Sequence, residues 1–512
     1  MGVQHIGFGN RKYLAAQTDA IVHRASFFNR LYLEIGGKLS YDYHAARILP
    51  GYDPNVKVEV LRNLAKSKEF EVLYCLSAKQ LEGGKIRADF NMNYANISIK
   101  NINDLRNFGF DVSAVIINRF SGERSAEKFK RYLTNTGMRV YLQPEIEGYP
   151  VNIERIVSSE GYGKTAYIET KKDLVVVTGA GPGSGKMATC LSQMYHENKK
   201  GIRVGFSKYE TFPVWNLPLE HAVNLAYEAA TADIADKNMV DPFYLQRTQK
   251  VAINYNRDIE NYEIISSILK KIVGDLNEHE KEAYGSPTDI AISLTKEGII
   301  NDEICQEAAK QEIIRRYFNY KKDAILGKEP KETLDRMDVL LNKLNLTPEY
   351  RSTVIPAREA MASCKNTPGK GHKDVYCGSA IQLHDGKIIA GKNSPLLHAG
   401  SAAVINSIKY LARIPDAKKL LPAETIGQIT ELNKSILNSN SESLNVNEVL
   451  IALATSARTN EGTKIAMTKL KELRDCNMHT THLLSPGDDD GLRKLGISVT
   501  TDAMFTTLQY IL

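Results

Sequence analysis

The stretch LVVVTGAGPGSGKMATCLSQMYHE, residues 174–197, constrains the fold of this chain more than any other segment. An apolar run leads into a glycine-rich turn and a lysine, and a helical pattern follows over Met187–His196. Glycines permit positive φ angles, so successive backbone N–H groups can point at one anion near the positive end of the helix. The segment therefore predicts a phosphate-binding loop made by Gly181, Gly183, Ser184, Gly185 and Lys186.

This loop departs from the phosphate-loop consensus G-x-x-x-x-G-K-[ST] at two positions. Ala180 replaces the first glycine, which is a mild change because a small residue can still turn there. Met187 replaces the hydroxyl residue that normally ligates Mg²⁺, so the usual route to this metal is missing. A second interpretation stays open, in which the glycines only allow close packing in a tight turn between a strand and a helix.

Short apolar runs in the N-terminal part predict β-strands that alternate with helical patterns. Several runs are continuously apolar, which favours strands buried on both faces of a parallel sheet covered by helices. The fold class expected here is α/β, with the ligand site at the carboxyl ends of the strands. The expected strands are Leu31–Ile35, Glu71–Leu76, Ser113–Ile117, Met138–Leu142, Leu174–Thr178 and Arg203–Phe206.

The later part of the chain divides into a helical region and a second, smaller α/β unit. Apolar residues at three- and four-residue spacing predict helices over Glu260–Val273 and Asp302–Tyr320. The expected domains are residues 1–250, 251–345 and 346–512. In the last of these we expect strands at Val375–Leu383, Lys387–Ala390, Glu448–Leu453 and His479–Leu484, helices at Leu397–Ile414 and Thr463–Arg474, and a loop over Asn433–Asn447.

Composition limits the class of protein. Of the 512 residues, 43% are hydrophobic and 25% charged, as in globular proteins of several domains. The net charge of +6 is small and not gathered into a basic arm, so no nucleic-acid partner is expected. Neither a signal peptide nor a membrane-spanning run is visible, and the six cysteines are widely spaced, so we expect a cytoplasmic protein with free thiols. A homo-oligomer is left open.

Polar residues that follow the predicted strands are candidates for the ligand pocket. Gly36, Gly37 and Lys38 come directly after the first strand, and His44 follows them, although a lone histidine is more often structural. A polar and aromatic stretch after the strand at Arg203–Phe206 leaves the sheet at the same edge. Its candidates are Lys208, Glu210, Trp215, Asn216 and Asp241, and the last of these has the alternative role of a helix cap.

Zinc chemistry is not expected. The pairs His196-Glu197 and His279-Glu280 lack the second histidine of the H-E-x-x-H pattern. His398 opens a predicted helix as in zinc deaminases, but Gly400 occupies the glutamate position and no paired cysteines follow. The C-terminal unit is therefore expected to have a deaminase-like layout without zinc.

Several long strings together resemble a known family, the domain of unknown function eighteen-forty-six, also called uncharacterised protein family three-seventy-one. These strings are LEIGGKLSYDYHAARILPGY, EGYPVNIERIVSSEGYG, the glycine-rich segment, WNLPLEHAVNLAYEAATAD with MVDPF, and IQLHDGKIIAGKNSPLLHA. The resemblance covers nearly the whole chain. It implies the same three-part architecture, and it supplies no catalytic residues.

The sequence thus predicts a protein that binds a nucleotide or another phosphorylated small molecule, with ATP as one candidate. If it is an enzyme, phosphoryl transfer is the expected class, because the loop and Lys186 would neutralise phosphate charge. The alternative is a non-catalytic sensor or assembly protein that keeps an enzyme-like fold, and Met187 favours it.

Overall fold

The computed structural model of the chain describes residues 6–84, 86–87, 92–437 and 442–506. The chain forms two compact units, His5–Ala309 and Lys310–Leu512, and the division falls within helix α16 (Asp302–Ile325). Residues 251–309, which the sequence assigned to a separate helical region, belong to the same compact unit as the glycine-rich segment.

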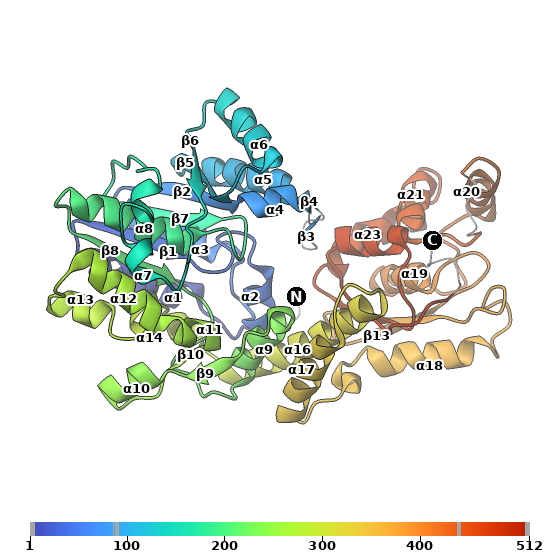
Figure 1. Cartoon of the computed structure of the whole chain (residues 1–512). Coiled ribbons are helices and arrows are strands. Elements are labelled where there is room, and N and C mark those ends of the chain that lie inside the picture. Colours follow the sequence, from blue (N-terminus) through green and yellow to red (C-terminus); the bar gives the residue numbers. More distant parts are fainter. Residues whose placement is uncertain (1–5, 85, 88–91, 438–441, 507–512) are drawn as a thin grey trace. The chain divides into compact units, whose positions relative to one another are not determined.

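The N-terminal unit is built on a seven-stranded sheet in which every neighbouring pair is parallel (Figure 1). This confirms the predicted α/β class with a central parallel sheet. The central strands are almost fully buried because helices cover both faces, which explains their continuous apolar runs. In sheet order the strands are β11 (Ala291–Ile292), β8 (Val204–Tyr209), β1 (Arg30–Ile35), β7 (Leu174–Gly179), β2 (Phe70–Ser77), β5 (Val112–Phe120) and β6 (Val140–Pro144).

The order of the strands contains a topological switch point, where neighbouring strands connect in opposite directions. Strand β7 lies between β1 and β2, although β2, β5 and β6 precede it in the chain. From β2 the chain continues to β5, away from β7, whereas from β7 it continues to β8 on the far side of β1. Loops that leave neighbouring strands in opposite directions leave an open crevice between them. A ligand site is therefore expected beside the loop that follows β7.

Helices pack around this sheet, and α8 (Lys186–Lys199) directly follows the glycine-rich turn (Figure 1). Cys190, Leu191 and Met194 of α8 are fully buried. The other helices of the unit are α1 (Asn10–Ala25), α2 (Tyr43–Ile48), α3 (Val56–Ala65), α4 (Ala78–Glu82), α5 (Tyr94–Asn107), α6 (Arg124–Asn135), α7 (Ile153–Ile156), α9 (Ala222–Ala230), α10 (Pro242–Thr248), α11 (Asn256–Glu260), α12 (Tyr262–Val273), α13 (Glu278–Ala283), α14 (Pro287–Ile290) and α15 (Thr295–Gly298).

The predicted helices at Glu260–Val273 and Asp302–Tyr320 are confirmed as α12 and α16. Short strands in the same part of the chain were missed, since two or three residues carry no measurable periodicity. They are β11 of the main sheet and the antiparallel pair β9 (Asn238–Val240) and β10 (Ile253–Tyr255). A further antiparallel pair joins β3 (Ile86–Arg87) and β4 (Met92–Asn93).

The C-terminal unit contains a four-stranded mixed sheet. Its order is β13 (Ile388–Lys392), β12 (Gly378–Gln382), β14 (Asn477–Thr480) and β15 (Ser498–Thr501), and only β14 and β15 are parallel. Its apolar core includes Val404, Leu453 and Met478. The helices are α17 (Lys331–Lys343), α18 (Val354–Cys364), α19 (Ala399–Leu411), α20 (Ala423–Ser435), α21 (Val446–Ser456), α22 (Glu461–Thr468) and α23 (Pro486–Lys494).

Two expectations for this unit were wrong. Glu448–Leu453 is not a strand but part of α21, because Asn445 and Glu448 form a reciprocal capping box that starts a helix. The predicted strand at His479–Leu484 is shorter and earlier, ending at Thr480. Of the predicted loop over Asn433–Asn447, the first residues lie in α20, and 438–441 lie outside the described residues.

Candidate functional site

The glycine-rich loop, residues 179–185, joins the carboxyl end of β7 to the first turn of α8. Gly185 is the N-cap residue of α8 and has a φ of 84°, a conformation that side chains rarely adopt. Within the part of the chain that the structure describes, the amides of Gly181, Gly183, Gly185 and Lys186 donate to no protein acceptor. The loop thus presents several N–H donors at the positive end of a helix, which is what an anion requires.

Polar side chains brace the inner side of this loop. The Asn118 amide at the end of β5 donates to the Ser184 carbonyl over 2.9 Å and to the Thr189 hydroxyl over 3.1 Å. A Cβ atom on Gly185 would lie 2.6 Å from Nδ2 of Asn118, so only glycine fits at this position. The hydroxyl of Ser184 is fully buried and finds no hydrogen-bond partner in the described ranges. Asn118 therefore holds the loop in place through hydrogen bonds on its buried side. The sequence did not reveal this role.

Lys186 does not stand alone at the mouth of the loop. Its ammonium nitrogen lies 3.7 Å from a carboxylate oxygen of Glu34, at the end of the neighbouring strand β1. Glu34 is only 9% exposed, and its second oxygen, Oε2, has no hydrogen-bond partner among the described residues. The sequence analysis expects Lys186 to neutralise phosphate charge, and the structure pairs its ammonium group loosely with a buried acid.

A second ion pair lies on the other side of Glu34. Lys208 of β8 is opposite Glu34 in the sheet register, and its ammonium donates to Asp258 over 2.8 Å. Burial would lower the pKa of Lys208, but the nearby Asp258, Glu34 and Glu210 raise it well above its ordinary value. Lys208 therefore stays charged, and the carboxyl edge of the sheet holds acids and lysines side by side.

Glu210 occupies the space that a side chain at position 36 would fill. A Cβ atom on Gly36 would lie within 2.5 Å of both carboxylate oxygens of Glu210. Burial raises the pKa of Glu210 to about 7, while Lys208 and Lys57 lower it and Asp258 and Glu34 raise it further. A carboxyl group in this range exchanges its proton near neutral pH, as acid–base groups in active sites do.

Lys57 of α3 is a further buried member of this charged group. Its ammonium is 2% exposed, donates to the Gly36 carbonyl over 2.8 Å and lies 3.9 Å from Asp42. Burial lowers the pKa of Lys57, although Asp42 and Glu210 counteract this. The ammonium thus fixes the turn after β1, where Gly37 has a φ of 63°.

Aromatic rings border the same edge. His44 lies 5.5 Å from the ring of Tyr227 and 6.0 Å from that of Phe212, and these two rings stack at 5.0 Å. Tyr227 also contacts Tyr255, and burial followed by the charge of Glu210 raises its pKa. Lys38 is partly exposed in the preceding loop. His44 therefore lies beside Tyr227, which is close enough to Glu210 to respond to its charge, and the assignment of these residues to a ligand pocket stays a prediction.

The remaining predicted pocket residues have structural contacts. The indole nitrogen of Trp215 donates to the Ser293 carbonyl, and the Asn216 carbonyl accepts from Lys296. Asp241 is fully buried and accepts from amides at the starts of α10 and α14. Within the described ranges, these three residues form no hydrogen bond or ion pair with the glycine-rich loop.

The sequence missed Glu34, Lys57, Asn118 and Asp258. Only Glu34 had a visible signal, since an acid inside the apolar strand LYLEI is unusual where both faces of a strand are buried. The other three come to the site through tertiary folding.

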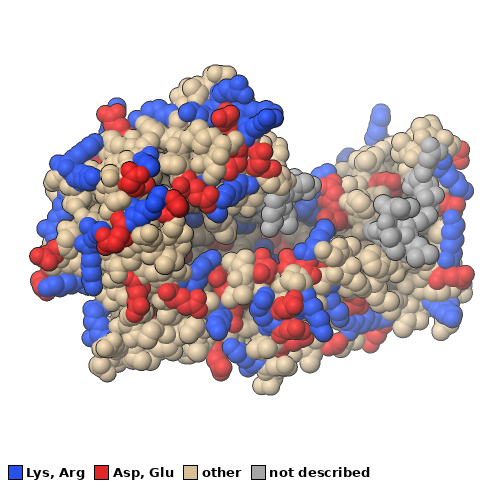
Figure 2. All heavy atoms as spheres, in the orientation of Figure 1, with Lys and Arg blue, Asp and Glu red and all other residues tan. Residues whose placement is uncertain are grey.

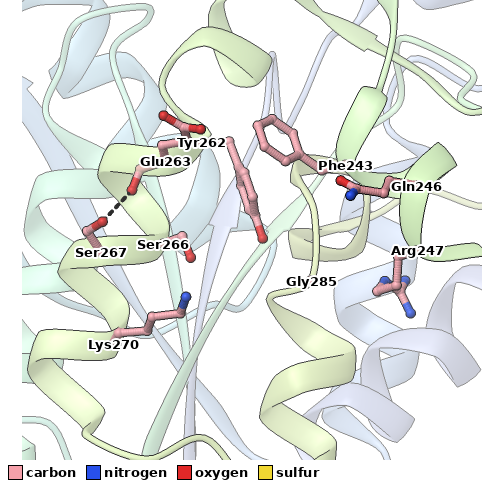
Figure 3. A pocket seen from close by; sticks show the side chains of 9 residues that line it. All are labelled: Phe243, Gln246, Arg247, Tyr262, Glu263, Ser266, Ser267, Lys270 and Gly285. Carbon is pink, nitrogen blue, oxygen red and sulfur yellow. Dashed lines mark hydrogen bonds between the residues drawn. The ribbon is translucent and has the colours of Figure 1, made fainter.

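A shallow hollow of about 540 Å³ lies elsewhere on the N-terminal unit, between α10 and α12 (Figure 3). The rings of Phe243 and Tyr262 meet there at 4.4 Å, and Arg247 pairs with Asp289 rather than pointing freely into the space. It shares no lining residue with the glycine-rich loop. The hollow lacks the buried charged side chains that occur at the carboxyl edge of the sheet.

The C-terminal unit has its own polar cluster at His398, the N-cap residue of α19. Nδ1 of His398 lies 2.6 Å from Oδ2 of Asp488, which also accepts from Ser485. The other oxygen of Asp488 accepts from the Val446 amide. Asp488 thus joins the starts of α19, α21 and α23. No group of three metal-ligating side chains occurs among the described residues.

The surface carries charges of both signs. Lys and Arg are interspersed with Asp and Glu over the face seen in Figure 2, without one dominant sign. Among the described residues, no helix is long and apolar enough to cross a membrane. All six cysteines are free and buried.

The fold and the charged edge define a class, namely an α/β protein of two units with a parallel seven-stranded sheet and buried acids and lysines at the strand ends. The chain belongs to the DUF1846 family. The model "Domain of unknown function DUF1846, N-terminal" matches residues 6–345, and its C-terminal counterpart matches 349–510. This confirms the family resemblance seen in the sequence.

Similar proteins cover almost the full chain. A UPF0371 protein of Clostridium tetani (strain Massachusetts / E88) is 44% identical over 497 residues, which is 97% of each chain. A UPF0371 protein of Clostridium botulinum (strain Alaska E43 / Type E3) has the same identity and coverage. These names state no activity.

Proposed function

We propose that this protein binds a nucleotide or a related phosphorylated small molecule at the glycine-rich loop. The observation that carries the proposal is the set of unengaged amides of Gly181, Gly183, Gly185 and Lys186 at the start of α8. A phosphate group accepts hydrogen bonds from such amides and is stabilised by the helix dipole. Lys186 would then turn from Glu34 toward the phosphate oxygens, since a distance of 3.7 Å reflects a loose pair.

Phosphoryl transfer is the reaction class that fits this site, because it depends on positioning and charge neutralisation rather than on a protein nucleophile. Lysines 57, 186 and 208 supply positive charge within the N-terminal unit. The aromatic group of His44, Phe212 and Tyr227 supplies ring surface near the same edge for a nucleoside or another flat group.

The test is thermal unfolding of the full chain with inorganic phosphate, pyrophosphate, ATP, GTP and glucose 6-phosphate. A ligand at 100 times its dissociation constant adds roughly 2.7 kcal/mol to the stability of the folded state. We expect at least one compound to raise the unfolding temperature of the wild type and none to do so for Lys186→Ala. A Lys186→Ala variant that binds as tightly as the wild type would refute the proposal.

A second candidate function, a non-catalytic sensor or assembly protein, is favoured by the pairing of Lys186 with Glu34. In that case the ion pair and the bracing by Asn118 serve packing alone. The same panel separates the two candidates, because the structural role requires that no phosphorylated compound changes the unfolding temperature.

For the C-terminal unit we infer a deaminase-like layout without zinc. The support is the position of His398 at the start of α19, beside a mixed sheet, with Asp488 as its partner in place of a metal. Zinc analysis of the purified protein tests this inference, since stoichiometric zinc would contradict it.

A further inference from the structure

We propose that Glu34 is the protein ligand of a divalent cation, Mg²⁺ in the cell, that binds together with the phosphorylated ligand. This inference rests on the proposed function, because the ligand phosphates supply the other coordinating oxygens. It assigns a metal site to a loop that lacks the usual hydroxyl residue at Met187.

The Glu34 carboxylate is buried and only partly paired. The residue is 9% exposed, Oε1 lies 3.7 Å from Lys186, and Oε2 has no hydrogen-bond partner within the part of the chain that the structure describes. A buried carboxylate oxygen without a partner is costly, so native proteins rarely leave one without a function. A cation at this oxygen would satisfy it.

Glu34 lies beside the glycine-rich loop in the sheet. Glu34 lies at the carboxyl end of β1, the strand next to β7, from which the glycine-rich loop leads to α8. Because its carboxylate is within 4 Å of Lys186, a phosphate held by the loop and Lys186 would also lie close to it. In phosphate-loop enzymes an acid on a strand of the same sheet helps to hold the Mg²⁺ that bridges the phosphates.

A single carboxylate suits the coordination chemistry of Mg²⁺. Mg²⁺ usually keeps several waters and takes one or two carboxylates together with substrate phosphates, rather than a cage of protein ligands. The described residues contain no group of three metal-ligating side chains, so they offer no such cage. Glu34 with phosphate oxygens and water fits this mode of binding.

The charges of the lysines and acids at this edge of the sheet nearly balance without a ligand. Lys186 and Lys208 are balanced by Glu34 and Asp258, and Glu210 lies nearby. A phosphate alone would bring further negative charge next to these acids. A divalent cation offsets that charge and releases Lys186 from Glu34 to the phosphate. Metal and phosphate should therefore bind cooperatively, each weakly without the other.

The test is calorimetric titration of the full chain with pyrophosphate, once with EDTA and once with excess MgCl₂. We expect Mg²⁺ to raise the affinity of the wild type by about tenfold or more, which corresponds to about 1.4 kcal/mol. Glu34→Gln should lose this enhancement while it still binds pyrophosphate in EDTA. Glu34→Asp, which keeps a carboxylate, should retain part of it. Glu263→Gln, an exposed acid in the hollow between α10 and α12, is the matched control and should behave as the wild type.

The outcomes separate the two proposals. If the wild type binds no compound of the thermal-unfolding panel under either condition, or if Lys186→Ala binds as tightly as the wild type, the proposed function fails and this inference with it. If the wild type binds equally well with EDTA and with Mg²⁺, only the metal site is refuted. It is also refuted if Glu34→Gln gains affinity in EDTA and keeps the full effect of Mg²⁺, since Glu34 would then merely compete for Lys186.

Discussion

Gly36 and Glu210 share one space at the carboxyl edge of the parallel sheet. The Gly36 amide donates to the Tyr209 carbonyl, so position 36 lies next to Glu210 across β1 and β8. The Glu210 carboxylate fills the volume where a Cβ atom of residue 36 would project. Glycine is therefore required here by the Glu210 side chain, which follows β8, and not by backbone strain.

Gly36→Ala should destabilise the N-terminal unit and displace the Glu210 carboxylate. Overpacking of a well-packed site costs about 1–3 kcal/mol, and we expect a loss in this range from urea unfolding. The double variant Gly36→Ala/Glu210→Ala should be less destabilised than the sum of the two single variants, because removal of the carboxylate makes room for the methyl group. Additive effects would show that the two residues do not compete for this space.

Asn118→Asp should loosen the glycine-rich loop while keeping the shape of the side chain. The change removes the amide that donates to Ser184 and Thr189, and it brings a carboxylate against the Ser184 carbonyl. Loss of a buried hydrogen bond with an acceptor left unsatisfied costs about 1–3 kcal/mol. Urea unfolding should show this loss, and calorimetry should show weaker binding of pyrophosphate. Unchanged affinity would mean that the loop needs no support from Asn118.

The main sheet and the loop were predictable from the sequence because they depend on local patterns. The run Leu174–Thr178 is buried on both faces, and the glycines that follow it turn the chain into α8. The charged group was only partly predictable. Lys208 and Glu210 follow a strand and were expected, but their neighbours Lys57 and Asp258 come from α3 and α11, and no local pattern joins them.

The error at Glu448–Leu453 shows how an apolar run misleads. The segment VLIAL has no polar residue to reveal whether its period is two or close to four, so it suits a buried strand or a buried helix. The decisive information lies before it, where Asn445 and Glu448 cap each other's backbone. Capping residues therefore deserve the same weight as hydrophobicity when such a run is assigned.

Asn445→Ala should destabilise the C-terminal unit by about 1 kcal/mol, the usual cost of losing an N-cap side chain. The variant loses the acceptor for the Glu448 amide, whereas the Val446 amide keeps its bond to Asp488. Asn445→Ser, which retains an N-cap oxygen, serves as the control and should recover most of the stability. An equal loss in both variants would point to the packing of Asn445 against Gly487 rather than to the cap.

The pair His398 and Asp488 should make the stability of the C-terminal unit depend on pH. Burial would lower the pKa of His398, but its hydrogen bond to Asp488 raises it above the ordinary 6.5. Burial would raise the pKa of Asp488, but the same hydrogen bond lowers it below 3.8. The raised pKa of His398 stabilises the fold fully below pH 6.5, and this effect is lost as the pH rises through the pKa of His398 in the folded state. The lowered pKa of Asp488 stabilises the fold above pH 3.8, and this effect is lost as the pH falls through the pKa of Asp488 in the folded state.

Asp488→Asn should therefore cost more stability at pH 6 than at an alkaline pH above the folded pKa of His398, where the imidazole is neutral in the wild type as well. Removing one partner of a buried pair costs about 3–5 kcal/mol, and we expect a value near the lower end at pH 6, since asparagine still accepts one hydrogen bond. Urea unfolding of both proteins at the two pH values measures the difference, and the histidine ring signals in NMR report the pKa of His398 directly. A cost that is the same at both pH values would show that Asp488 acts only by capping α21 and α23, and not through the charge of His398.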